Sequence, residues 1–139
     1  MLQKIFRPMY MLPLAALLVA SPWAEAGRLQ PIYTPDPIEI PAGKSANDVN
    51  QGIRKALFSL DFKTKEISPG HLEATHVKHS RDMEHTAVLT IKYDSKTVRI
   101  AYKDSKDLNY DQKAGEIHGT YNRWVRNVEK RIRSNLGSY

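Results

Sequence analysis

The sequence predicts a two-layer α+β domain, in which a four-stranded antiparallel meander is covered on one face by an N-terminal and a C-terminal helix. Residues 45–60 and 117–136 repeat apolar residues at the three- and four-residue steps of a helix. The region between them alternates apolar and polar residues, as half-buried strands do. Its connections are short and polar, which is typical of antiparallel hairpins. A sheet with one exposed face needs cover on the other, and the two helices can provide it.

The composition fits one globular domain and excludes several classes of protein. The chain has 139 residues, of which 41% are hydrophobic and 26% charged, and its formal net charge is +6. This length allows a single domain. The lack of Cys excludes a disulfide, a thiolate zinc site, a Cys nucleophile and a lipid-bearing Cys. The positive charge permits anionic partners.

Residues 1–26 have the pattern of a secretory signal peptide. Two bases precede an apolar run over residues 9–20, and Ala24 and Ala26 are the small residues that suit a cleavage site. As a helix this run would rise about 18 Å, which is too short for a hydrocarbon core of roughly 30 Å. We therefore expect a periplasmic protein that begins at Gly27, is not lipidated and keeps no transmembrane segment.

Residues 27–43 are expected to form an extended, mostly unpacked linker before a folded domain at residues 44–139. The segment is rich in proline, which fixes φ and cannot donate to a ladder or a helix. The four prolines are Pro31, Pro35, Pro37 and Pro41. The alternative is a Pro-rich ligand for a groove, but no P-x-x-P with a flanking base is present.

Local signals place the elements of the domain. Ser45 can cap the first helix, and Asp48 suits the positive end of its dipole, whereas Gly52 weakens the helix slightly. The expected strands are 62–68, 71–79, 85–93 and 97–103, with a polar connection at 80–84 and a polar loop at 104–115. The expected core is Val49, Ile53, Leu57, Leu89, Ile91, Ile100, Trp124, Val128 and Ile132.

The densest group of polar and aromatic residues runs from the last strand into the last helix. It consists of Tyr102, Asp104, Ser105, Asn109, Tyr110, His118, Tyr121, Asn122 and Trp124. This group predicts either a small ligand-binding cleft with an aromatic floor and a polar rim, or a set of structural contacts. His118 and Asn122 are four residues apart and share a helix face. We favour the structural interpretation, in which both hold the loop at 104–115 against the final helix.

Two strings in this region resemble a known group of proteins. They are Y-K-D-S-x-x-L-N-Y over residues 102–110 and I-H-x-x-Y-N-R-W-V-x-N over residues 117–127. Together they resemble an uncharacterised family of small exported bacterial envelope proteins, many of them lipoproteins, with a C-terminal I-H-x-x-Y-N-x-W-V helix. The resemblance covers about residues 46–135 and implies a small antiparallel sheet, an envelope location and no assigned activity. The missing lipidation Cys departs from the lipoproteins of that family.

Two chemical alternatives remain open. Asp104, Ser105 and His118 are the residue types of a hydrolase triad, although no nucleophile-elbow sequence accompanies them. A copper or zinc site is the other alternative, because His79 and His85 would face each other across a hairpin, with His71 on the same strand face. Two facing His fall short of the three or four ligands that zinc prefers.

The expected function is non-enzymatic binding of an anionic envelope component or a protein partner, without a cofactor. Basic residues on two faces could contact phosphate or carboxylate groups. They are Lys63, Lys65 and Lys78 on the strands, and Arg123, Arg126, Lys130 and Arg133 on the last helix. An exported protein meets little nucleic acid, so that partner is not expected.

Overall fold

The computed structural model describes residues 28–139, so the predicted signal peptide lies outside the described residues. The elements are β1 (Leu29–Pro31), β2 (Ile38–Glu39), α2 (Ala46–Ser59), β3 (Lys63–Ser68), β4 (His71–Ser80), β5 (Met83–Tyr93), β6 (Thr97–Lys106), β7 (Glu116–His118) and α3 (Gly119–Leu136). Between residues 28 and 139, neither helix has the length and apolar character needed to cross a membrane.

The strands form a five-stranded antiparallel sheet and a separate two-stranded sheet. The order in the larger sheet is β2-β6-β5-β4-β3, and β1 pairs with β7 in the smaller one. The predicted α+β class is confirmed, and the four predicted strands correspond to β3–β6. The prediction was incomplete because β2 adds a fifth strand beside β6, through the pairs Ile38↔Val98 and Glu39↔Thr97.

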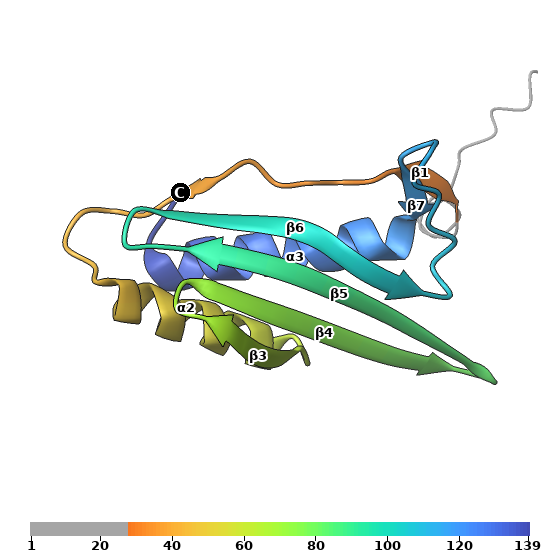
Figure 1. The fold of residues 1–139 in the computed structure, drawn as a ribbon, viewed down its shortest axis with the longest axis horizontal. Helices are drawn as coiled ribbons and strands as arrows, with labels where there is room; N and C mark the ends of the chain where they lie inside the picture. The colour runs from red at the N-terminus through yellow and green to blue at the C-terminus, as the bar shows by residue number, and fades with distance from the viewer. Residues whose placement is uncertain (1–27) are drawn as a thin grey trace, which may run out of the picture.

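Both helices lie on one side of the large sheet, and the core fills the space between the layers (Figure 1). The alternation along β5 and β6 points Leu89, Ile91 and Ile100 toward the helices, where they are at most 2% exposed. All nine predicted core residues are buried, including Trp124 at 8% exposure. The apolar stripes of α2 and α3 therefore pack as their spacing predicts.

The Pro-rich segment is packed onto the domain, and the prediction of a mostly unpacked linker at residues 27–43 was wrong. Figure 1 shows residues 28–40, here called the N-terminal strap, running along the domain from the two-stranded sheet to the edge of the five-stranded sheet. The residues between the prolines keep their N–H groups. Ile32 N donates to Gly115 O at 2.9 Å, and Ile40 N donates to Lys96 O at 2.8 Å. Ile38 is 0% exposed.

The helix starts follow the capping rules, with one correction. Ser45 and Asp48 form the reciprocal bonds of a capping box at the start of α2. The last helix begins at Gly119, two residues later than predicted, because Ile117 and His118 pair with β1 instead. The burial of Ile117, at 0% exposure, therefore belongs to a strand and not to the helical stripe.

Candidate functional site

Three of the four aromatic residues in the predicted cluster contact one another, whereas the fourth, Trp124, packs against His76. The Tyr102 ring lies 4.2 Å from Tyr110 and 5.6 Å from Tyr121, measured between centroids. Tyr121 is 1% exposed, and burial raises its pKa and that of Tyr102. These rings are packed against one another, so they support the fold more than they form an open floor.

A bulge in β6 explains why Tyr102 meets Ser105. Tyr102 lies opposite Leu89 and Asp104 opposite Val88, so Lys103 is the extra residue. The alternation of side chains restarts there, and Tyr102 and Ser105 point to the same face. Their oxygens Oη and Oγ are 2.8 Å apart and share a hydrogen bond.

Asn122 does not hold the loop at 104–115, and this prediction was wrong. Its side chain is 1% exposed and bonds to the N-terminal strap. Tyr33 N donates to Asn122 Oδ1 at 2.8 Å, and Asn122 Nδ2 donates to Pro31 O at 2.9 Å. The contact spans about ninety positions of sequence, which no local pattern indicates.

His118 caps α3 with its side chain and contacts the loop with its backbone. Nδ1 accepts a hydrogen bond from Thr120 N at 3.2 Å, and the His118 backbone N donates to Leu108 O at 2.9 Å. Because Nδ1 is an acceptor, neutral His118 carries its proton on Nε2. Burial lowers the pKa of His118, and the nearby charges of His85 and Arg123 lower it further.

The hydrolase alternative finds no support in this geometry. Asp104 Oδ1 accepts from Ser105 N at 2.8 Å, while Ser105 Oγ pairs with Tyr102 and His118 Nδ1 caps its helix. Among the bonds of residues 28–139, none joins Ser105 to His118 or His118 to Asp104, as nucleophile, base and orienting acid require. Asn109 adopts a left-handed backbone conformation, with a φ of 51°, which Asn tolerates and which lets the loop turn at this position.

The three candidate metal ligands do not converge. The β4–β5 turn is one residue out of the expected register, so His79 faces Glu84 and His85 faces Lys78. A shift of one residue moves a side chain to the other face, and His79 and His85 therefore lie on opposite faces of the sheet. His71 pairs with Lys92, near the other end of β4. In the described part of the chain, no three His, Asp or Glu side chains form a metal-binding group.

A cleft does open beside the cluster, between the β4–β5 hairpin and the start of α3. It encloses about 180 Å³. The lining residues are Lys78, Ser80, His85, Leu108, His118, Thr120, Arg123 and Trp124. Of the predicted ligand-binding cluster, only His118 and Trp124 line it, and they are joined by His85 from the candidate metal ligands and by the predicted bases Lys78 and Arg123. Figure 1 shows the β4–β5 hairpin extending past the end of β3. Lys78, Ser80 and His85 of this hairpin line the cleft.

The inward face of the hairpin could have indicated this cleft from the sequence. The inward positions of β4 change from the apolar Leu72 and Ala74 to His76, Lys78 and Ser80. Polar residues at inward positions mean that the strand has passed beyond the core. His85, paired with Lys78, continues this face on β5, and its Nδ1 lies 2.7 Å from Asp107 O. Since a carbonyl only accepts, the proton of neutral His85 is on Nδ1.

The positive side chains of the cleft are not neutralised by acids. Lys78 and Arg123 take part in none of the ion pairs formed by residues 28–139. Both are exposed. Within those residues, the cleft lining contains no carboxylate. The arrangement can bind an anion through charge-assisted hydrogen bonds, which are about twice as strong as neutral ones.

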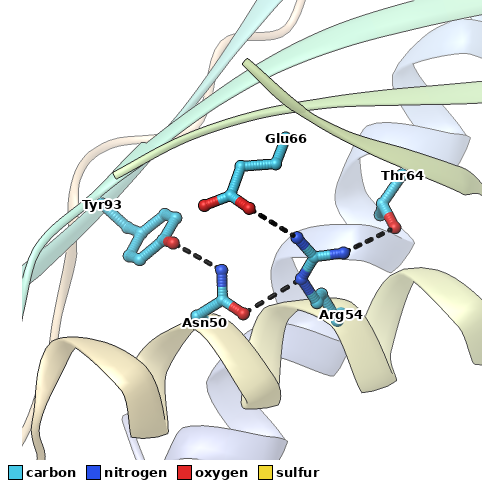
Figure 2. Close-up of polar contacts among 5 residues, drawn as sticks. All are labelled: Asn50, Arg54, Thr64, Glu66 and Tyr93. Carbon is cyan, nitrogen blue, oxygen red and sulfur yellow. Dashed lines mark hydrogen bonds and ion pairs between the residues drawn. The ribbon is translucent and has the colours of Figure 1, made fainter. Parts of the chain in front are cut away.

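A second polar cluster, which sequence reasoning missed, joins α2 to the sheet at the opposite end of the domain. Figure 2 shows Arg54 between three partners. Its Nε donates to Asn50 Oδ1 at 3.0 Å, Nη1 donates to Thr64 Oγ1 at 3.4 Å, and Nη2 lies 3.8 Å from Glu66. Asn50 in turn donates to the Tyr93 hydroxyl. The four-residue spacing of Asn50 and Arg54 could have indicated from the sequence that the two side chains meet on one helix face. The contacts of the cluster join α2 to the sheet, so we assign it a structural role.

No protein-family model matches this sequence, and no curated protein is significantly similar to it. The chemistry of the cleft is therefore argued from its own side chains.

Proposed function

We propose that the protein is an exported, non-enzymatic binding protein whose cleft holds an anionic group of an envelope component. The observation that carries the proposal is the lining, in which Lys78, His85, His118 and Arg123 surround one hollow of about 180 Å³. Lys78 and Arg123 carry the positive charge of this lining, and a bound phosphate or carboxylate would offset both charges. The planar guanidinium of Arg123 also suits bidentate contact with either group.

The protonation state of His118 supplies a direct readout of binding. Its pKa is lowered by burial first, and then by the electrostatic effects of His85 and Arg123. An anion in the cleft offsets those effects, so binding raises the pKa of His118. This shift would be seen in the imidazole resonances during a titration.

The binding test uses inorganic phosphate and D-galacturonate as probes. Arg123→Gln and Lys78→Gln are each expected to weaken binding by about tenfold, the loss of one charge-assisted contact. Lys113→Gln is the matched control, because Lys113 is exposed and lies outside the cleft lining. Equal affinity in wild type and all three variants would contradict the proposal.

Export is supported by the signal-peptide pattern of residues 1–26 and by the resemblance of residues 102–127 to exported envelope proteins. The expected result is a periplasmic protein whose mass corresponds to a chain beginning at Gly27, since Ala24 and Ala26 suit the peptidase. Mass spectrometry of the periplasmic fraction checks it. An intact Met1 in that fraction would contradict cleavage.

A further inference from the structure

The cleft is the first of four hollows that follow one another along α3. It shares Trp124 with a second hollow lined by Phe62, His76 and Asn127. That one shares Leu60 and Asn127 with a third, which reaches Lys130 and Arg131. The third shares Arg131 with a fourth, which lies between α2 and α3 and includes Lys55 and Asn135. Because each hollow borders the next through a shared residue, the four form a row along α3, here called the groove.

Helical spacing explains why the groove follows a single face of α3. Among the α3 residues that line it, Thr120, Arg123, Asn127, Arg131 and Asn135 recur at steps of three and four. The helix has 18 residues, which span about 27 Å at 1.5 Å per residue. Figure 1 shows α3 running nearly the full length of the large sheet. The groove is therefore long enough for an extended chain and not only for one small anion.

The groove has a strong excess of positive charge. Its lining contains Lys44, Lys55, Lys78, Arg123, Lys130 and Arg131. Across residues 28–139 none of these six joins an ion pair. The acids that line it are Asp48 and Asp61. Asp48 already bonds to Ser45 in the capping box, and these bonds lower its pKa. A ligand with negative charges repeated along its length matches this lining.

Between the bases, the groove offers neutral hydrogen-bonding side chains. Ser59, Gln51 and Asn135 lie at the α2 end, and Asn127 and Ser134 lie along α3. Hydroxyls and amides placed between cations suit a ligand that alternates hydroxyl groups with anionic groups. Resting on the proposed anion binding in the cleft, we propose that the whole groove binds a linear acidic polysaccharide.

The test compares short and long oligomers of one chemistry. Oligogalacturonates of two and six sugars are titrated into the protein by calorimetry at low salt. The hexamer is expected to bind at least about tenfold more tightly than the dimer, because it reaches the bases beyond the cleft. Raising the salt concentration should weaken hexamer binding more than dimer binding.

A double variant at the far part of the groove separates the two proposals. Lys130→Gln with Arg131→Gln should lower hexamer affinity by about tenfold and leave dimer affinity unchanged. Lys92→Gln with Arg99→Gln is the matched control, because it removes one Lys and one Arg that pair across β5 and β6 on the opposite face. This control should bind both oligomers as the wild type does.

Three outcomes would overturn the inference. Dimer and hexamer that bind equally would refute the extended groove while leaving anion binding in the cleft intact. If neither oligomer binds, the groove and the cleft proposal both fail. Polyphosphate or oligothymidine that binds more tightly than an oligogalacturonate of equal charge would refute the assignment to a polysaccharide.

Discussion

Asn122 does for the N-terminal strap what a neighbouring strand would do. In an extended chain, the carbonyl of one residue and the N–H two residues later point to the same side. Pro31 O and Tyr33 N are such a pair, and one side-chain amide satisfies both, at 2.9 and 2.8 Å. The intervening Ile32 N points the other way and donates to Gly115 O. A single buried amide therefore joins α3 to the strap.

Replacing Asn122 should separate the strap from α3. Asn122→Ala leaves Tyr33 N and Pro31 O without their partner, at a cost of about 1–3 kcal/mol in the free energy of unfolding. Amide exchange at Tyr33 should accelerate in the same variant. Asn127→Ala, an exposed position on the same helix, is the control. Denaturant unfolding measures the first effect, and an unchanged midpoint for Asn122→Ala would show that the contact contributes nothing.

His118 should make stability depend on pH in a defined direction. Its pKa is lowered in the folded protein, so the unfolded chain binds its proton first as the pH falls. The contribution of neutral His118 is fully present above the unfolded pKa of about 6.5, and is lost as the pH falls from there toward the lowered value. Lys78, His85 and Arg123 share its cleft. Of these, His85 and Arg123 lower the pKa of His118 further.

The variant His118→Asn isolates this effect. Asn is a good N-cap that does not titrate, so the helix start is kept while the proton site is removed. When the pH is lowered from about 7.5 to about 5.5, the wild type should lose more stability than His118→Asn does. Denaturant midpoints at both pH values test this. If the wild type and His118→Asn differ in stability by the same amount at both pH values, the pH dependence does not come from His118.

At the scale of elements, the contact between α2 and α3 depends on a residue without a side chain. A Cβ at Gly52 would lie within 3.0 Å of Leu136 Cγ, and Asn135 Nδ2 donates to Gly52 O at 3.1 Å. The helices approach closely at this point because Gly52 leaves room. Gly52 has a low helix propensity, but its lack of a side chain improves the packing of α2 against α3.

Gly52→Ala sets helix propensity against packing. Ala would favour the helix by about 1 kcal/mol. Leu136 is 2% exposed and would have to move, and such overpacking costs about 1–3 kcal/mol. We expect a net loss of about 1 kcal/mol, measured by denaturant unfolding. In the background Leu136→Ala the same substitution should become stabilising, because the clash is gone, and a loss of equal size there would contradict the steric explanation.

At the scale of the whole molecule, the N-terminal strap connects both sheets to the helical layer. β1 pairs with β7, β2 pairs with β6, and the Tyr33 hydroxyl donates to Glu129 on α3 at 3.0 Å. Arg126 lies 4.3 Å above the Tyr33 ring, a cation–π contact. The strap is part of the domain although it is rich in proline.

A chain that begins at residue 44 should therefore be much less stable than one that begins at residue 27. It loses Ile38, which is fully buried, and leaves the polar groups of Asn122 unpaired. Together these changes should cost about 3–6 kcal/mol. Thermal and denaturant unfolding of the two chains would show the difference. Equal stability would support the linker that the sequence predicted.

The candidate site was predictable only in part. His118 and Trp124 were in the predicted group because they belong to a dense local cluster. Arg123 is on the same helix as Trp124, whereas Lys78 and His85 come from β4 and β5. These two reach the start of α3 only because the β4–β5 register turns them inward beyond the core. One residue of difference in that register would place them on the outer face.

Local sequence patterns were sufficient to predict the elements: two amphipathic helices, the Ser45 cap and four alternating strands with their core positions. These features depend on periodicity and on neighbours a few residues apart, which any segment carries with it. The position of the proline segment, the bonding partner of Asn122 and the place where the cleft opens could be learned only from the folded chain. Each of these depends on contacts between segments distant in the chain, whose geometry is set by packing and strand register rather than by local preference.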